Sequence, residues 1–246
     1  MKLRYLMMAF VTLATAAPAA TPDPKLFRKA LADYGTCIVK WEPVKARDFV
    51  LSGVFIKYRD QIQMFYSREC MPGEYIRRAG LAATGNSSMA SGGRLRFPDV
   101  IIRWAIAGAL FNRDAAKLTL IDFTAVPKLS YEEPFPVRTT NKDGDPLPSE
   151  RIAEQQKRFD EKASDVALAK VGECVARADG AATRAALLTP IDTAAELAAL
   201  RSLAPTLSNC LPKGQTIGFD RMSLRGSLAV AFYRLASAGQ PSGAAS

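Results

Sequence analysis

Histidine is absent from the 246-residue chain, and this absence excludes several kinds of chemistry. Ser-His-Asp and Cys-His nucleophile systems, HExxH zinc sites and histidine-ligated haem all require an imidazole. The GxSxG, SxxK, P-loop and GxGxxG motifs are also missing. We therefore expect no metal, no cofactor and no catalytic residue. A histidine-independent hydrolase remains an alternative, because the two carboxylates of such a site can lie far apart in sequence.

Long apolar runs are scarce, and the one near the N-terminus has the pattern of a secretory signal. Lys2 and Arg4 precede a stretch of 13 uncharged residues, Tyr5 to Ala17. Small residues at the end of this stretch fit cleavage before Ala20. We predict a signal peptide over residues 1–19 and a mature protein that is periplasmic or secreted. An uncleaved anchor is the alternative, but a spanning helix needs about 20 apolar residues.

Internal repetition is the most informative feature that is present. When Cys37 is aligned with Cys174, an offset of 137, residues of the same kind pair along the chain without a gap, and a second block aligns at an offset of 122. The identical pairs include Gly35 with Gly172, Arg47 with Arg184, Leu51 with Leu188, Phe97 with Phe219, Arg103 with Arg225, Ala107 with Ala229 and Ala109 with Ala231. Because the matches keep the same order, we predict a tandem duplication.

The duplication divides the chain into two units. We predict a first helical unit over 20–126, a Pro-rich linker over 127–148, a second helical unit over 149–236 and a disordered tail over 237–246. The alignment leaves 18 extra residues in the first unit, and we assign them to a Gly/Ser-rich insertion over 72–94. Such a composition lacks the apolar period that packing requires.

Cysteine is sparse, and its four residues fall two to a unit. An exported protein folds in an oxidising compartment, so we expect disulfides rather than thiols. Four cysteines allow three connectivities, and the duplication selects Cys37–Cys70 and Cys174–Cys210. No CxxC pair is present, which argues against a zinc site and against a thiol redox centre.

Apolar residues recur at helical spacing in both units, as at Phe27, Leu31, Tyr34 and Ile38. The predicted fold class is therefore mainly α, with two tandem helical units that either pack together or are joined by the Pro-rich linker. The segment 118–123 is the one candidate for a short strand. No later apolar run is long enough to span a bilayer, so we predict no transmembrane segment in the mature chain.

Four arginines match between the units, in the pairs Arg47 with Arg184 and Arg103 with Arg225. Arginine forks suit carboxylate or phosphate, so two equivalent anion sites are one interpretation. The interpretation that we favour is structural, with each arginine bound to an acid or to helix-end carbonyls. Arg103 falls in an apolar helix, where an unpaired charge would be costly.

A basic segment with interleaved aromatic residues runs from Lys57 to Arg113, and its excess of basic over acidic residues accounts for much of the chain's formal charge of +9. A basic surface attracts polyanions such as acidic lipid headgroups or lipopolysaccharide. We do not expect nucleic acid as a partner of an exported protein. The candidate contact patch consists of Arg77, Arg78, Arg94 and Arg96, which flank or occupy the insertion.

The repeated pattern of one cysteine pair, two matched arginines and an Ala-x-Ala-x-[Phe/Tyr] run in each unit resembles that of uncharacterised exported bacterial proteins with duplicated helical halves. The resemblance covers about residues 30–113 and 167–234, and it implies no activity. We expect a non-catalytic binding or scaffolding protein of the bacterial cell envelope, whose partner is an anionic envelope component or another envelope protein. A peripheral protein docking on anionic lipid or lipopolysaccharide is a further alternative.

Overall fold

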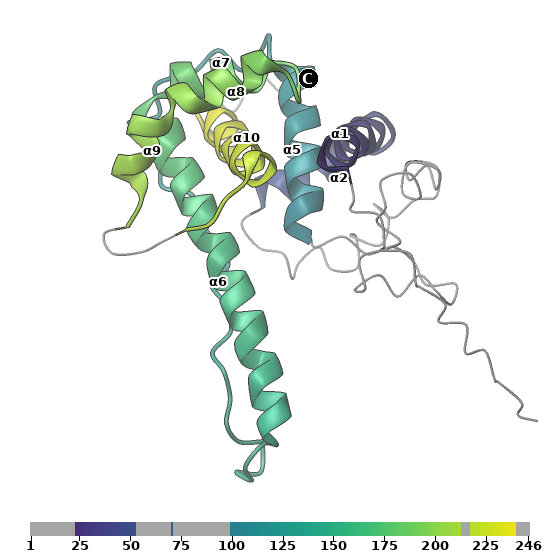
Figure 1. Ribbon diagram of the computed structural model, residues 1–246, viewed down its shortest axis with the longest axis vertical. Helices are drawn as coiled ribbons and strands as arrows, with labels where there is room; N and C mark the ends of the chain where they lie inside the picture. Colours follow the sequence, from purple (N-terminus) through teal and green to yellow (C-terminus); the bar gives the residue numbers. More distant parts are fainter. Residues whose placement is uncertain (1–22, 53–69, 71–98, 213–216, 240–246) are drawn as a thin grey trace, which may run out of the picture.

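The computed structural model describes residues 23–52, 70, 99–212 and 217–239. This part of the chain forms eight helices and, within these ranges, no strand, so the mainly α class is confirmed (Figure 1). The suggestion of a strand over 118–123 is wrong, because the carbonyls of Leu118 and Phe123 accept hydrogen bonds from arginine side chains rather than from a neighbouring strand. Among the described residues, no helix is both long and apolar enough to cross a membrane.

Several sequence predictions fall outside these ranges. They are the signal peptide over 1–19, the insertion over 72–94 and most of the tail. The four arginines of the contact patch also lie there: Arg77, Arg78, Arg94 and Arg96. The last helix continues to Ala238, two residues beyond the predicted end of the second unit.

The helices of the two halves follow one another in the same order. The first half contains α1 (Pro24–Trp41), α2 (Pro43–Leu51) and α5 (Asp99–Asp114), and the second contains α6 (Ser149–Ala178), α7 (Gly180–Leu188), α8 (Ala194–Ser202), α9 (Ala204–Cys210) and α10 (Arg221–Ala238). Side-chain caps start several of them, as where Asp23 accepts the Lys25 N–H at 2.9 Å and where Asp220 and Ser223 form a capping box.

The first helices of the two halves, α1 and α6, end at aligned residues. The offset of 137 places the end of α1, Trp41, on the end of α6, Ala178. The residues that follow, Glu42 and Asp179, have similar backbone angles, with φ −131° and ψ 57° against φ −147° and ψ 74°. The chain therefore turns in the same way into α2 and into α7.

Matched glycines allow the same close helix contact in both halves. A Cβ on Gly35 would overlap the carbonyl oxygen of Ala105, so α1 and α5 approach backbone to backbone there. A Cβ on Gly172 would lie 2.8 Å from the carbonyl oxygen of Ser227, where α6 meets α10. Ala105 and Ser227 are themselves 122 positions apart, which is the offset of the second aligned block.

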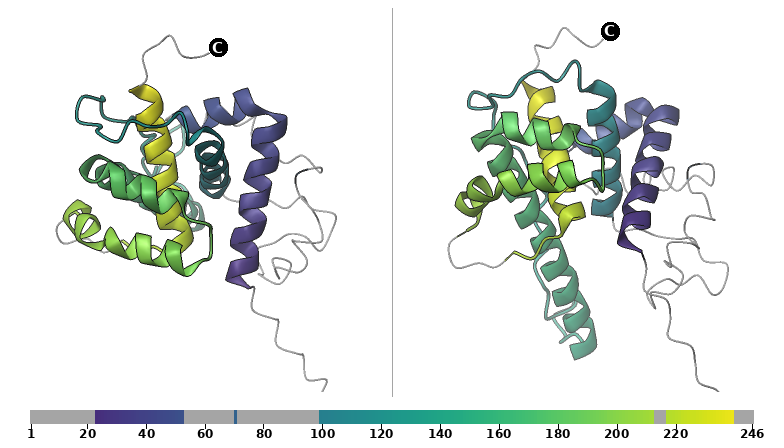
Figure 2. Two further views of the ribbon diagram at one scale, coloured as in Figure 1. Left: turned by 90° about the horizontal axis from the view of Figure 1, so that it is seen from above. Right: turned by 45° about the horizontal axis from the view of Figure 1, so that its top comes forward.

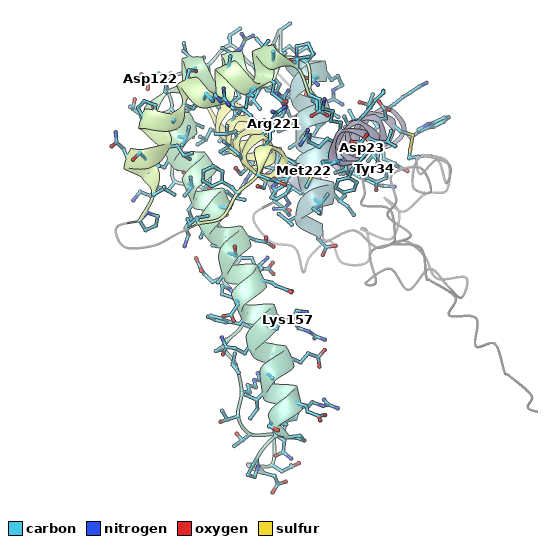
Figure 3. The ribbon with its side chains drawn as sticks, in the orientation of Figure 1. Asp23, Tyr34, Asp122, Lys157, Arg221 and Met222 are labelled. Carbon is cyan, nitrogen blue, oxygen red and sulfur yellow. A yellow bond between two sulfur atoms is a disulfide. The ribbon has the colours of Figure 1, made fainter. Side chains whose placement is uncertain are left out.

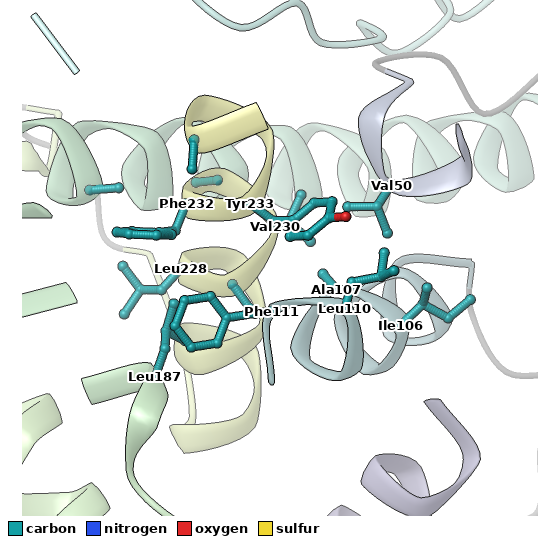
Figure 4. Packing of buried hydrophobic residues seen from close by; sticks show 14 of the residues in the cluster. Val50, Ile106, Ala107, Leu110, Phe111, Leu187, Leu228, Val230, Phe232 and Tyr233 are labelled. Carbon is teal, nitrogen blue, oxygen red and sulfur yellow. The ribbon is translucent and has the colours of Figure 1, made fainter. Parts of the chain in front are cut away.

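The core belongs to both halves. Buried residues of all eight helices form one continuous apolar cluster. Its centre is the crossing of α5 and α10, where Phe232 makes an edge-to-face contact with Phe111 at 5.5 Å (Figure 4). Phe232 makes a second edge-to-face contact with Phe123 at 5.2 Å. Seen from above, α5 lies between α1 and α10 (Figure 2). The two halves thus pack together rather than standing apart on a linker.

One disulfide lies in each half, as predicted. Cys37 is bonded to Cys70 and Cys174 to Cys210, with Cα–Cα distances of 5.5 and 5.7 Å. No cysteine remains free. Each bond ties the helix that carries its first cysteine, α1 or α6, to a residue more than thirty positions later.

The Pro-rich segment 127–148 runs beside the protruding N-terminal half of α6 (Figure 1). Side chains of the helix hold it in place. Lys162 pairs with Glu132 at 2.9 Å, and the buried Glu173 accepts hydrogen bonds from the Tyr131 hydroxyl at 2.7 Å and from the Leu129 N–H at 3.0 Å. Burial and the bond to Glu173 raise the pKa of Tyr131. The segment is therefore anchored along α6 and forms part of the fold.

Candidate functional site

A cavity of about 90 Å³ lies where α1, α5 and α10 meet the start of α8. We call it the junction pocket. Its apolar wall includes Leu31, Trp104, Ala105, Ala109, Met222 and Ala229. Its polar lining includes Arg28, Thr36, Asn112, Glu196, Arg221 and Arg225. A volume of this size holds about six to nine water-sized positions, enough for a small organic molecule.

The indole of Trp104 forms part of the wall because Gly226 makes room for it. A Cβ on Gly226 would lie only 2.6 Å from Cδ2 of the indole. Trp104 projects from α5 and Gly226 belongs to α10, so the ring is held at the crossing of the two central helices. The aromatic face supplies a flat apolar surface next to the charged rim.

Two acidic side chains organise the rim. Asp192 lies in the turn before α8 with φ +65°, a backbone conformation that Asp tolerates better than most residues. Arg28 of α1 donates from Nε to the Asp192 carboxylate at 2.6 Å. Glu196 is fully buried, and its Oε2 accepts the Asp192 N–H at 2.8 Å. The turn is therefore fixed from both sides and connects α1 to α8.

Arg225 closes the inner end of this charge cluster. Its guanidinium donates to the carbonyls of Ala186, Leu187 and Thr189 at 3.0, 2.8 and 2.9 Å, and it lies 3.3 Å from Oε1 of Glu196. Burial lowers the pKa of Arg225, while Glu196 and Asp192 act in the opposite direction. A guanidinium keeps its charge in proteins, so Arg225 compensates the buried carboxylate.

Arg221 differs from the other two arginines of the pocket. Within the described part of the chain its contacts are two long ion pairs, 3.9 Å to Asp192 and 3.7 Å to Glu196. Its side chain is 25% exposed, and Figure 3 shows it with Met222 between α10 and α5. The five donors of a guanidinium exceed these two contacts, so Arg221 can still bind a carboxylate in the pocket.

Three arginines line the pocket against one lining carboxylate, Glu196, and the Asp192 carboxylate lies beside it, bound to Arg28. Asp192 and Glu196 are engaged by Arg28 and Arg225, which leaves the charge of Arg221 in excess. Among the described residues no cluster of three metal-ligating side chains is present. The arrangement favours a ligand with one negative head group and an apolar body.

The structure places the matched arginines of the sequence at helix ends. Arg103 donates to the Ser52 carbonyl at 3.0 Å, and Arg225 donates to the Thr189 carbonyl at 2.9 Å. Ser52 and Thr189 are the C-cap residues of α2 and α7, and they are themselves an aligned pair. Arg103 also lies over the Phe49 ring, 4.9 Å from its centre.

The other matched pair has a different setting. Arg184 donates to the carbonyls of Ala115 and Leu118 at 2.9 and 3.2 Å, which fastens α7 to the end of α5. Arg47 lies near Tyr233, whose pKa it helps to lower against burial and the bond to Asp114. Neither residue lines the junction pocket. The four predicted patch arginines lie outside the described residues.

Arg28, Asp192, Glu196 and Arg221 are not among the residues predicted from the sequence. One signal was available: Thr193-x-x-Glu196 has the spacing of a capping box. Thr193 does cap α8, accepting the Glu196 N–H at 3.1 Å. The Glu196 carboxylate, however, binds the N–H of Asp192 instead of that of Thr193. The contact between Arg28 and Asp192 joins residues that are 164 positions apart, and no local sequence pattern predicts it.

Comparison of the chain with protein-family models, with curated proteins and with solved structures finds no match.

Proposed function

We propose that this chain is an exported, non-catalytic binding protein of the bacterial cell envelope, and that its ligand in the junction pocket is a small organic carboxylate with an apolar body. The observation that carries the proposal is Arg221. It projects into an apolar-walled pocket with donor capacity that its two long ion pairs leave unused.

Export is supported by the cysteines and by the first residues. The two disulfides indicate an oxidising, non-cytoplasmic compartment. A signal peptide over 1–19 and release into the periplasm or medium would account for this setting. Mass spectrometry of the exported protein should then find Ala20 as the first residue, whereas an intact Met1 in the envelope would argue against export by cleavage.

Binding is favoured over catalysis by the state of the acids in the pocket. Asp192 and Glu196 each bind arginine, and Glu196 also accepts a backbone N–H. A general acid or base needs a proton that it can exchange with the substrate, and a carboxylate fixed between cations serves this poorly. The two acids are therefore fixed in ion pairs with Arg28 and Arg225, and Arg221 is left to bind a ligand.

A tandem duplication accounts for the architecture that surrounds the pocket. Matched glycines make matched backbone contacts, and Arg103 and Arg225 bind aligned C-cap carbonyls. The repeated features all hold helices together. The features specific to the pocket, such as Arg28 and Arg221, are not shared by the other half, where Asp165 and Asp99 occupy the aligned positions.

Calorimetric titration with benzoate tests the proposal, with benzamide as the neutral analogue. We expect one benzoate per chain, no measurable benzamide binding and at least a ten-fold loss of benzoate affinity in Arg221→Gln. Arg201→Gln is the matched control, because Arg201 is an exposed arginine on α8 outside the pocket. Equal affinity for benzoate and benzamide, or an unchanged affinity in Arg221→Gln, would refute the proposal.

Docking on anionic lipid is the alternative that concerns Arg77, Arg78, Arg94 and Arg96. A basic patch predicts retention on heparin or on anionic vesicles at low salt, with strong salt dependence. Neutralising these four arginines should abolish the retention while leaving benzoate binding intact. Retention that survives their neutralisation would exclude the patch as the contact surface.

A further inference from the structure

A second cavity, of about 50 Å³, lies on the other side of the α5–α10 crossing. We call it the α6-side cavity. It is lined by α5, α6 and α10 and by Tyr131 and Glu132 of the Pro-rich segment. Trp104 lines this cavity as well as the junction pocket, so the indole separates the two.

The two cavities occupy corresponding positions in the two halves. Under the offsets of 137 and 122, most residues of one lining fall on residues of the other. The corresponding pairs include Arg28 with Asp165, Ala32 with Ala169, Arg225 with Arg103, Ala105 with Ser227, Gly108 with Val230 and Asn112 with Arg234. The duplicated frame therefore leaves a hollow at the same place twice, with different side chains in each.

Arg234 is the most unusual group in the α6-side cavity. It is 5% exposed, and its guanidinium lies over the Tyr131 ring, 5.5 Å from the centre. Its NH2 nitrogen donates to the Ser130 carbonyl at 2.9 Å, whereas its buried Nε has no hydrogen-bond partner. A buried cation with an unused donor is costly, and a hydrogen-bond acceptor in the cavity would offset that cost.

The remaining charges leave the cavity positive. Lys162 and Glu132 neutralise each other at 2.9 Å. Arg103, which binds the Ser52 carbonyl, and Arg234 then face the single carboxylate of Asp165. Arg103 and Arg234 are both more than nine-tenths buried, so little water screens them.

We propose that the α6-side cavity is a second anion site, which binds a carboxylate as small as acetate through Nε of Arg234. The volume corresponds to about three to five water-sized positions, too few for the ligand of the junction pocket. One ligand oxygen accepts the Nε proton, and the methyl group faces Val166, Ala169 and Val230. Asp165 opposes the ligand charge and keeps the affinity low.

A titration of the full chain with labelled acetate, monitored by NMR, tests this site. Saturating benzoate is present throughout, so that the junction pocket is already occupied. We expect one further site per chain, at least a ten-fold loss of acetate affinity in Arg234→Gln and no change in Arg221→Gln. Lys157→Gln is the control, because Lys157 is exposed on the protruding half of α6 (Figure 3). An acetate site lost in Arg221→Gln, or displaced by benzoate, would overturn the proposal.

A second variant keeps the test decisive if Arg234→Gln does not fold. Asp165→Asn removes the opposing charge and should tighten acetate binding about three- to ten-fold at pH 7. Unchanged or weaker acetate binding in folded Asp165→Asn would contradict the site. Failure of benzoate to bind would refute the junction pocket alone, because the two sites use different arginines.

Discussion

The indole of Trp104 fits against Gly226, and these two residues occupy aligned positions in the two halves of the chain. One half supplies the largest side chain and the other supplies none at the point where α5 crosses α10. A bulky residue at both positions could not be accommodated. Gly226 thereby sets the distance between the central helices and the shape of both cavities.

Gly226→Ala should push the indole aside and destabilise the protein by about 1–3 kcal/mol. The new Cβ would lie 2.6 Å from Cβ of Trp104 as well, so a small rotation of the ring cannot relieve the overlap. Urea unfolding measures the loss. Gly108→Ala is the control on α5, where a Cβ meets nothing within 4 Å, and it should gain up to about 1 kcal/mol.

The close contacts at Gly35 and Gly172 should fail in the same way. Gly35→Ala forces α1 away from the Ala105 carbonyl, and Gly172→Ala forces α6 away from the Ser227 carbonyl. Because backbone atoms cannot rotate aside, we expect each change to cost about 2–4 kcal/mol in urea unfolding. If either variant unfolds at the wild-type urea concentration, the helices are not in contact as described.

Removal of Arg225 should be one of the most damaging single changes. Arg225→Ala leaves the buried Glu196 with only its longer ion pair to Arg221, and it removes the guanidinium donor from three carbonyls. We expect a loss of about 3–5 kcal/mol. Glu196→Gln in the same background should recover part of it, and a double-mutant cycle gives the coupling energy. Strictly additive losses would show that the pair is not coupled.

Each disulfide should stabilise its half of the chain. On the chain-entropy model, loops closed over 33 and 36 positions predict about 4 kcal/mol for each bond. Cys37→Ser with Cys70→Ser, and Cys174→Ser with Cys210→Ser, measure the two contributions by urea unfolding. Non-reducing peptide mapping of the wild type should find these two pairs, and a bond between the halves would contradict the fold.

The end of α5 should make stability depend on pH in the acid range. Burial acts to raise the pKa of Asp114, but hydrogen bonds from Arg113 and from the Tyr233 hydroxyl, the latter at 2.9 Å, outweigh it and hold the pKa below its usual value. The stabilisation is therefore present above the unfolded pKa of about 4 and is lost as the pH falls through the folded pKa.

Tyr233→Phe measures this contribution. At pH 7 it should cost about 1.5–3 kcal/mol, because the hydroxyl donates to a charged acceptor. The difference from wild type should shrink below about pH 4, when Asp114 becomes protonated. In the alkaline range, burial and Asp114 raise the pKa of Tyr233 to about 12, so its phenol should ionise at a higher pH than a tyrosine with the ordinary pKa of about 10. A cost that stays constant down to pH 2.5 would contradict the pairing.

The helices and both disulfides could be predicted from the sequence because their signals are local or repeated. Apolar spacing marks α1, Asp23 with Pro24 marks its start, and the alignment of Cys37 with Cys174 selects the pairing. The same alignment also identified Arg103 and Arg225 as a pair. Their bonds to helix-end carbonyls were one of the two options that residue type alone leaves open.

The candidate site could not be predicted because it is assembled from distant segments. Arg28, Asp192 and Arg221 come from α1, from the turn before α8 and from α10, and no spacing rule relates them. The hollow itself follows from the crossing of α5 with α10 and from the missing side chain at Gly226, which only the packed structure reveals.

The fluorescence of Trp104 tests the junction pocket most directly. The chain has two tryptophans, and the exposed Trp41 can be replaced by Phe so that Trp104 reports alone. Benzoate should then change the emission of Trp41→Phe in a saturable way, and Arg221→Gln in that background should abolish the change. An emission unaffected by benzoate, or a change that persists without Arg221, would contradict a carboxylate-binding pocket at the crossing of the two central helices.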